Sequence, residues 1–304
     1  MRRKTFEISV IVPTYNRSEQ LEYTVKSLLK QSINPSQFEL IVVDDGSSDN
    51  THALVKKYEQ LLNIKYAYQK DDGYRVSAAR NLGTKLADGG VCLFIDSGIV
   101  LKSDCLQQHI TYHKQQTQEV ALIGYTYGYI HSNDKESELI ELINPEDVDA
   151  SILHLQQKNK FTDLREGIYR RYGHQLEGML VPWTIFWGGH LSIKRSTFAK
   201  VGLWDEGYDG NWGCEDNDLG YRIYDSGCPI HVHQHAAVLH LPHNTSEDQK
   251  KNEGYTNCLY FHNKFNTAET QLFLDLYLNE ISDQSSEKGV IDFNALLAQN
   301  RVAS

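Results

Sequence analysis

Ile8-Ser9-Val10-Ile11-Val12 is a short run of β-branched residues broken by one serine, and the polar stretch Pro13-Thr14-Tyr15-Asn16-Arg17 follows it directly. Apolar runs of the same kind return at residues 38–43, 64–68 and 91–95. Amphipathic segments with helical periodicity lie at 18–31, 49–62, 76–87 and 103–114. Apolar strands joined by crossover helices are typical of a parallel sheet. The sequence therefore predicts an α/β fold with a mostly parallel central sheet and helices on both of its faces.

Polar clusters follow all four predicted strands, at residues 13–17, 44–49, 70–75 and 96–98. Each cluster alone is also ordinary turn and helix-capping chemistry. Ligands of such sheets bind outside the carboxyl ends of the strands, where these clusters would converge. Together they predict a nucleotide pocket with an aromatic wall, a carboxylate for base or ribose, and an arginine for phosphate. The sequence has no Gly-x-Gly-x-x-Gly or Walker motif, which argues against a dinucleotide oxidoreductase or a P-loop enzyme.

The composition of the chain limits the kinds of partner and compartment that we expect for the protein. The chain has 304 residues, 40% of them hydrophobic, and a formal net charge of −10. This charge does not favour nucleic-acid binding, which needs clustered Lys and Arg. We find no apolar stretch long enough for a signal peptide or a membrane span, so we expect a cytoplasmic protein, or one peripheral at the inner face of a membrane. The five cysteines lie far apart and are expected to be reduced and structural.

The segment Trp212-Gly213-Cys214-Glu215-Asp216-Asn217-Asp218-Leu219 places three carboxylates within four residues at the start of a predicted helix. At helical spacing they fan round about one turn, so one or two can point into a cleft. In that case the segment supplies a carboxylate that can act as a general base. The alternative is a charged first turn that the helix dipole favours.

Four motifs in order resemble the family 2 glycosyltransferases, which are inverting enzymes of the GT-A fold that use nucleotide sugars. They lie at residues 9–17, 42–47, 79–83 and 94–98. Residues 187–195 and the Trp212–Leu219 segment resemble the bacterial chondroitin-polymerase type and the galactosyltransferase-like C-terminal half. The resemblance covers about residues 6 to 265. It implies transfer of a hexose or N-acetylhexosamine from a UDP-sugar to a hydroxyl of a glycan, lipid-linked or natural-product acceptor.

The resemblance also assigns roles to residues on the donor side. It implies that Pro13, Tyr15 and Asp45 hold the uracil and ribose, and that Arg17 and Arg80 lie near the phosphates or the carboxylates. On the acceptor side, Asp216 becomes the base that takes the proton of the acceptor hydroxyl, and Glu215 orients the acceptor or the base. The remaining substrate contacts implied are the aromatic faces of Trp187, Trp212 and Tyr208 and the backbone at Gly188 and Gly189. Core packing is the alternative for each aromatic residue.

The chain departs from the family where a divalent metal is usually bound. Asp96-Ser97-Gly98 stands where the family has Asp-x-Asp, so the second carboxylate is missing. His243 matches the family's metal-ligating histidine in position. Two accounts stay open: Asp96 and His243, helped by His240, hold Mn²⁺ or Mg²⁺, or histidines and arginines stabilise the diphosphate without metal. We favour the first. His231, His233 and His235 alternate and are expected to form one face of a strand rather than a zinc site.

The predicted domain organisation is a transferase domain at 6–265 and a helical appendage at 266–304. The domain would comprise a nucleotide-binding half at 6–125, a helical insert at 126–181 and an acceptor-binding, catalytic half at 182–265. We expect the insert to form the acceptor side or a solvated helical excursion. The appendage is expected to pack on the domain or to mediate dimerisation.

Two functions of other classes compete with the transferase. One is a nucleotide-sugar or glycan-binding protein on a degenerate transferase scaffold, which Gly98 would favour. The other is a histidine-rich metallohydrolase. Release of UDP in the presence of an acceptor would separate the transferase from the binding protein, and hydrolysis of substrates without a nucleotide would single out the hydrolase.

Overall fold

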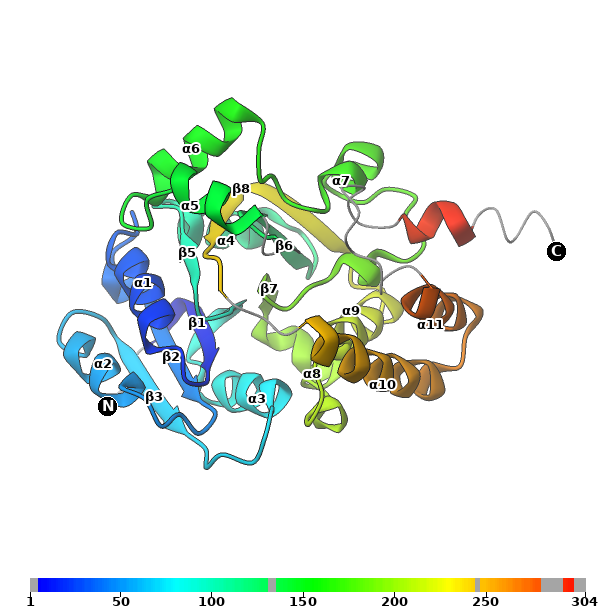
Figure 1. Ribbon diagram of the computed structural model, residues 1–304, viewed down its shortest axis with the longest axis horizontal. Coiled ribbons are helices and arrows are strands. Elements are labelled where there is room, and N and C mark those ends of the chain that lie inside the picture. The colour runs from blue at the N-terminus through cyan, green and yellow to red at the C-terminus, as the bar shows by residue number, and fades with distance from the viewer. Residues whose placement is uncertain (1–4, 131–134, 244–246, 280–291, 298–304) are drawn as a thin grey trace.

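The computed structural model describes residues 5–130, 135–243, 247–279 and 292–297. Within them, one sheet of eight strands has the order β3-β2-β1-β4-β7-β6-β8-β5 (Figure 1). The strands are β1 (Phe6–Thr14), β2 (Phe38–Asp44), β3 (Ile64–Tyr68), β4 (Gly89–Ile95), β5 (Ile99–Leu101), β6 (Ala121–Tyr127), β7 (His190–Lys194) and β8 (Ile230–His240).

The first half of the sheet is parallel, as predicted. β1 pairs in parallel with both β2 and β4, and β2 pairs in parallel with β3. Alternate residues of β1 enter two different apolar cores, with Val10 and Val12 in one and Ile11 in the other. Because side chains alternate across a strand, the two cores lie on opposite faces of the sheet. Helices therefore cover both faces, and the continuous apolar run at 8–12 is explained by burial on both sides.

The second half of the sheet mixes strand directions. β7 runs antiparallel to both β4 and β6, β8 runs parallel to β6, and β5 runs antiparallel to β8. The pairing of β6 with β8 shifts register between Gly124 and Tyr125, since Gly124 faces His233 but Tyr125 faces Ala237. Periodicity reports a strand and not its direction, so the sequence could not reveal these reversals.

The helices of the first third lie within a few residues of their predicted positions. They are α1 (Ser18–Leu29), α2 (Thr51–Tyr58), α3 (Val76–Leu86) and α4 (Cys105–Gln115). A 3₁₀ turn, η1 (Pro35–Gln37), precedes β2. The predicted insert carries α5 (Glu136–Leu142), α6 (Val148–Lys158) and α7 (Glu166–Tyr172).

The C-terminal half has one long and several short helices. In chain order they are η3 (Pro182–Ile185), η4 (Arg195–Thr197), α8 (Phe198–Val201), η5 (Glu206–Tyr208), α9 (Glu215–Asp225), α10 (Glu247–Phe265) and α11 (Ala268–Asn279). Figure 1 shows α10 and α11 side by side beyond α9, on the side of the sheet away from α1 and α2.

The described part of the C-terminal appendage packs on the domain. Phe273 of α11 and Phe293 join a third apolar core with Trp183 and Phe261. The ring centroids of Phe273 and Trp183 are 5.3 Å apart. Tyr208 also lies in this core, 1% exposed, so it packs rather than offering a face to a sugar. Among the described helices, none is both long enough and apolar enough to cross a membrane.

Candidate active site

Arg80 brings three of the predicted site residues together. It lies on α3, 3% exposed, and its Nη1 is 2.8 Å from Oε1 of Glu215, at the start of α9. Its Nη2 is 3.2 Å from Oδ1 of Asp96, at the end of β4. The guanidinium also lies over the ring of Trp204, 4.5 Å from its centroid. Burial alone would lower the pKa of Arg80, but the Asp96 and Glu215 carboxylates raise it. Arg80 therefore keeps its positive charge although it is buried.

Asp216 occupies the first turn of α9, beside this cluster. A tight turn leads into the helix, because Gly213 and Cys214 both have positive φ, +98° and 66°. Oδ2 of Asp216 accepts a hydrogen bond from the backbone N–H of Gly188 at 3.0 Å, and Oδ1 accepts one from the N–H of Asn217 at 2.8 Å. The carboxylate is thus held at a fixed orientation while the residue stays partly exposed.

Burial and the neighbouring Glu215 raise the pKa of Asp216 to about 7. The Gly188 N–H and the Arg80 charge act in the opposite direction. A general base works best when its pKa lies near the operating pH, because it must be ionised yet still bind a proton. The arrangement therefore gives Asp216 the properties of a base at neutral pH.

The two glycines before β7 are required by their neighbours. A Cβ on Gly188 would lie 2.7 Å from Nη2 of Arg80, and a Cβ on Gly189 would lie 3.1 Å from Oδ2 of Asp96. The sequence resemblance predicts that these glycines let the backbone approach the donor sugar. In the structure their missing side chains make room for Arg80 and Asp96, and the Gly188 N–H is used by Asp216.

Two tyrosines that the sequence analysis did not assign flank the carboxylates. Burial, and after it the Asp96 and Asp216 carboxylates, raise the pKa of Tyr129 to about 12. Burial of the hydroxyl and the charge of Glu215 likewise raise the pKa of Tyr74, although 41% of this residue is exposed. Tyr129 follows β6, so the rule that polar strand ends line the site could have found it. The sequence did not show β6 clearly enough for that.

The ring of Trp187 contacts both Tyr129 and the buried Arg165. Its ring centroid is 6.1 Å from that of Tyr129, and the residue is half-buried. Trp212, the other predicted stacking residue, is also half-buried, and its backbone N–H donates to Glu253 at 3.1 Å. Both aromatic residues keep some exposed surface that a sugar could contact.

At the nucleotide end, Asp45 is engaged by the protein itself. It is 7% exposed, and Oδ1 is 2.6 Å from Nε2 of Gln69 and 2.8 Å from Nη2 of Arg75. Its Oδ2 accepts from the Arg75 backbone N–H at 2.9 Å. A contact of Asp45 with uracil or ribose would thus add to these bonds or displace them. Sequence patterns did not identify Arg75 and Gln69 as the partners of Asp45.

The other residues predicted to bind the donor lie at the end of β1, the strand that pairs with β2. Tyr15 is 47% exposed, and its hydroxyl donates to Oδ2 of Asp71 at 3.1 Å. The carbonyl of Pro13 accepts from the Ser97 hydroxyl at 3.1 Å, which ties the end of β1 to the turn after β4. Arg17 lies partly buried at the start of α1. The exposed ring of Tyr15 is available for stacking on a base.

The predicted metal ligands are neighbours but do not form a compact group. The Leu241 N–H donates to the Gly98 carbonyl at 3.0 Å, and the rings of His240 and His243 are 5.2 Å apart. Asp96 is 48% exposed, but one of its oxygens is paired with Arg80. Across the described residues, three ligand atoms lie within 4.8 Å of one another at Cys105, His109 and His190, and at no other group. A carboxylate and imidazoles suit a divalent cation, so Asp96, His240 and His243 fit a partial site that substrate oxygens would complete.

Cys105, His109 and His190 are better explained as part of a hydrogen-bonded chain. Nε2 of His109 is 3.0 Å from Nε2 of His190, an ordinary hydrogen-bond length. The Ser192 hydroxyl lies 2.8 Å from both Nδ1 of His109 and Nε2 of His113. All of these residues are at most 2% exposed. Burial lowers the pKa of His113 to about 4 and that of His190 to about 3, so the imidazoles are neutral and can donate and accept in sequence.

Gly98 has a conformational reason to be glycine. Its φ is +96°, and its N–H donates to the Thr24 hydroxyl at 3.1 Å. A Cβ at this position would meet Gln20 of α1 at 3.4 Å. The contact with Gln20 is an ordinary one, but the positive φ of the turn between β4 and β5 favours glycine at 98 over a residue with a side chain.

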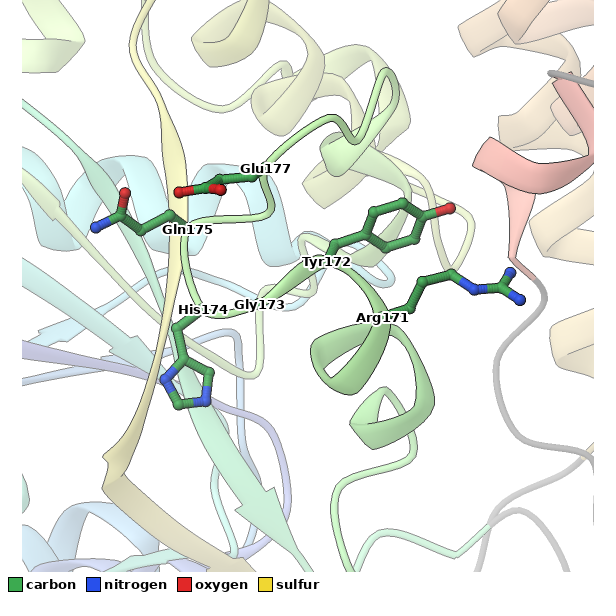
Figure 2. Close-up of a pocket in the computed structure, with 6 residues that line it drawn as sticks. All are labelled: Arg171, Tyr172, Gly173, His174, Gln175 and Glu177. Atoms are coloured by element: carbon green, nitrogen blue, oxygen red, sulfur yellow. The ribbon is translucent and has the colours of Figure 1, made fainter.

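The alternating histidines form a strand face, as predicted. Nδ1 of His231 is 2.9 Å from the Tyr112 hydroxyl, and Nε2 of His233 is 3.1 Å from Oε1 of Gln108, so both face α4. A cavity of about 430 Å³ opens near the same half of β8, where the Val232 N–H donates to the His174 carbonyl. Figure 2 shows that one continuous segment, residues 171–177, supplies its lining side chains. It lies toward the start of β8, whereas the site lies at the His240 end.

Comparisons with known proteins agree with the fold and the resemblance. A family model described as glycosyl transferase family 2 matches residues 9–175, and one described as N-terminal domain of galactosyltransferase matches residues 175–244. A validoxylamine A glucosyltransferase of Streptomyces hygroscopicus subsp. limoneus is 33% identical over 266 residues, 88% of this chain and 58% of the relative. A chondroitin synthase of Escherichia coli is 31% identical over 243 residues, 77% of this chain and 34% of the relative. The chain thus spans less than two thirds of each relative.

Solved structures share the architecture at low identity. S. aureus TarS 1-349 in complex with UDP has a TM-score of 0.60 and 20% identity, covering 90% of this chain and 71% of that one. The mannosyltransferase PcManGT from Pyrobaculum calidifontis, in complex with GDP-Man and Mn²⁺, has a TM-score of 0.57 and 15% identity, covering 98% and 80%. The expected GT-A fold is confirmed. Since the first family model spans residues 9–175 of 304, more than half of the sequence, the chain belongs to glycosyl transferase family 2.

Proposed function

We propose that the protein is an inverting glycosyltransferase that moves a hexose or N-acetylhexosamine from a UDP-sugar to an acceptor hydroxyl. The observation that carries the proposal is the carboxylate of Asp216, partly exposed and with a pKa near 7, beside Arg80, Glu215 and Asp96. These groups converge at the carboxyl ends of β1, β2 and β4, where an α/β sheet binds its ligands. The name of the glucosyltransferase relative supports transfer of a hexose, and the UDP of the TarS complex supports a UDP-sugar as donor.

The proposed reaction is one displacement. The acceptor oxygen forms a bond to the anomeric carbon as Asp216 takes the hydroxyl proton, and the bond from that carbon to the diphosphate oxygen breaks with its electron pair on UDP. Attack opposite the leaving group inverts the anomeric centre. The Gly188 N–H holds Asp216 in orientation, and Arg80 holds Glu215 beside it through an ion pair. Glu215 would orient the acceptor or the base.

Donor binding is assigned to Pro13, Tyr15, Arg17 and Asp45, with Arg80 and Asp96 at the diphosphate end. Tyr15 supplies an exposed ring for the uracil. A bound Mn²⁺ or Mg²⁺ would neutralise the leaving diphosphate, and Asp96, His240 and His243 are the residues that would hold it. The Mn²⁺ in the PcManGT complex supports this assignment by analogy.

The acceptor is assigned to the partly exposed faces of Trp187 and Trp212. One relative is named for validoxylamine A and another for chondroitin, so acceptors of both kinds belong in the assay. Neither competing function gains support from the described residues. Gly98 is explained by its backbone conformation, and the histidines of β8 are explained by contacts with α4.

The test is a screen of UDP-sugars against alcohol acceptors, read as UDP release with Mn²⁺, with Mg²⁺ and with chelator. Transfer that requires both a UDP-sugar and an acceptor would support the proposal. UDP binding without any transfer, by a protein that shows native stability, would favour a binding protein and overturn it.

A further inference from the structure

Arg165 is a buried cation that the proposed mechanism does not use. It comes from the segment before α7, within the predicted insert, and its side chain is 3% exposed. Asp163 pairs with it through both oxygens: Nε is 2.8 Å from Oδ1 and Nη2 is 2.7 Å from Oδ2. Asp163 itself is fixed, because Oδ2 also accepts from the Thr126 N–H of β6 at 2.9 Å. The pair is therefore anchored to the central sheet.

The remaining donors of Arg165 reach the segment that precedes β7. Nη1 donates to the carbonyl of Ile185 at 3.1 Å, and Nη2 is 3.4 Å from the carbonyl of Gly124. The guanidinium plane also lies 4.8 Å from the ring centroid of Trp187. One side chain thus connects β6, the end of η3 and the aromatic residue directly before Gly188.

Gly188 links this arrangement to the base. Its N–H is the backbone donor to Oδ2 of Asp216 at 3.0 Å, and Gly188 is bonded directly to Trp187. Moving Trp187 therefore moves the donor that orients Asp216. Displacement of a reacting group by about 1 Å can cost roughly a hundredfold in rate.

We propose that Arg165 is a positioning residue for transfer, which fixes Trp187 and Gly188 so that the Gly188 N–H meets the carboxylate of Asp216. The proposal rests on the proposed function, in which Asp216 is the base. In this proposal the predicted insert, through Arg165, helps to position the catalytic residues.

The chemistry of this position favours arginine specifically. A buried ion pair is weak evidence for stability, because desolvation offsets the attraction. Arginine offers five donors in a planar fork and can stack on an aromatic ring at the same time, whereas lysine is a point charge without that plane. The N–H groups of Arg165 donate to Asp163 and to two backbone carbonyls, and its guanidinium lies over the ring of Trp187.

A change at 165 can be detected through Asp216 because the largest charge effects on Asp216 come from Glu215 on α9 and Arg80 on α3. Asp216 in turn affects Tyr74 and Tyr129. Hydrogen bonds to a carboxylate favour its charged form. Loss of the Gly188 hydrogen bond therefore raises the pKa of Asp216.

The experiment compares Arg165→Lys with Arg170→Lys. Arg170 is a matched control, since it is an exposed arginine on α7 that pairs only with Glu166 in the i,i+4 position. For Arg165→Lys we expect kcat to fall by roughly ten- to a hundredfold, with UDP affinity unchanged and the acid limb of the pH profile moved to higher pH. Arg170→Lys should match the wild type in all three.

A direct titration separates this proposal from the proposed function. The pKa of Asp216, followed by carboxylate-selective ¹³C NMR, should rise in Arg165→Lys even if the assayed acceptor is wrong and no transfer is seen. An Asp216 titration and a kcat that match the wild type in a folded Arg165→Lys protein would overturn the positioning role. If Arg165→Lys does not fold, Trp187→Phe keeps the Arg165–Asp163 pair, weakens the stacking, and is read by the same titration.

Discussion

At the level of single residues, the site depends on two consecutive carboxylates that differ in burial and in their partners. Glu215 is buried and paired with Arg80. Asp216 is partly exposed, and its partners are backbone N–H groups. Burial and the neighbouring Glu215 raise the pKa of Asp216 to about 7, and the Arg80 charge, which also pairs with Glu215 and Asp96, opposes that rise. Two adjacent acids with different environments thus acquire different roles.

Asp216→Asn should abolish transfer while donor binding is retained. The amide has the shape of the carboxylate but cannot accept the acceptor proton, and general-base catalysis is worth roughly a hundredfold or more. Turnover and UDP affinity would be measured together. A variant that keeps more than about a tenth of wild-type turnover would point to another base.

The wild-type pH profile should show an acid limb near pH 7. Below that pH Asp216 is protonated and cannot take the acceptor proton, so kcat/KM should fall as the pH decreases and level off above it. The measurement is kcat/KM from pH 5 to 9 with saturating cofactor. A limb centred near pH 4 would assign the base to a carboxylate with an ordinary pKa.

Gly188→Ala should disrupt the site. The new Cβ would lie 2.7 Å from the buried Arg80 guanidinium, which is held on two sides by carboxylates and cannot move freely. We expect loss of transfer and lower stability. Gly167→Ala is the control: Gly167 lies in α7 and a Cβ there meets nothing within 4 Å, so this helix-favouring change should be neutral or stabilising.

At the scale of elements, α4 and β7 are joined by the buried histidine chain. His109 and His113 lie four residues apart on one face of α4, and Ser192 of β7 lies between their rings. His190, the first residue of β7, continues the chain directly after Gly189. This chain therefore anchors the strand whose start supplies the active-site glycines.

The histidine chain predicts a loss of stability in acid. The folded pKa of His113 is about 4, below the usual 6.5, so its contribution is complete above about pH 6.5 and is lost as the pH falls toward 4. For His113 the full contribution is about 3 kcal/mol. Denaturant unfolding between pH 7 and 4.5 should show a flatter dependence for His113→Gln than for the wild type. His154→Gln, at an exposed position on α6, should follow the wild type. Equal slopes for all three would contradict the prediction.

At the scale of the whole molecule, three apolar cores support the site. Two lie on the faces of the sheet, and the third joins α9, α10 and α11 to η3. The loop with Trp187 and Gly188 follows η3 directly, so the C-terminal helices contribute to the position of the site. The described part of the predicted appendage is in this sense integral to the fold, while the predicted domain boundaries remain a proposal.

Phe273→Ala should destabilise the whole protein. Phe273 is 5% exposed and packs on Trp183, Phe261 and Phe293. Removing such a ring typically costs about 3–5 kcal/mol. Leu259→Ala, at a position 37% exposed on α10, should change stability by no more than about 0.5 kcal/mol. Similar denaturation midpoints for the two variants would show that α11 packs only weakly.

The amino-acid pattern alone predicted the α/β class, the parallel first half of the sheet and the positions of α1 to α4. It could do so because apolar periodicity and strand-end polarity are local properties, as at residues 8–17. Contiguous motifs also predicted Arg80, Asp96, Glu215 and Asp216 as site residues, and the structure brings Asp96 and Glu215 together on Arg80.

The remaining features follow from tertiary packing, because they depend on groups far apart in the chain. The direction of β7 and the pairing of Asp45 with Arg75 both arise from long-range contacts. Arg165 is a charged residue, yet it is buried against Trp187. A pattern of residue types records which side chains are charged, and only packing decides whether that charge meets water or a partner.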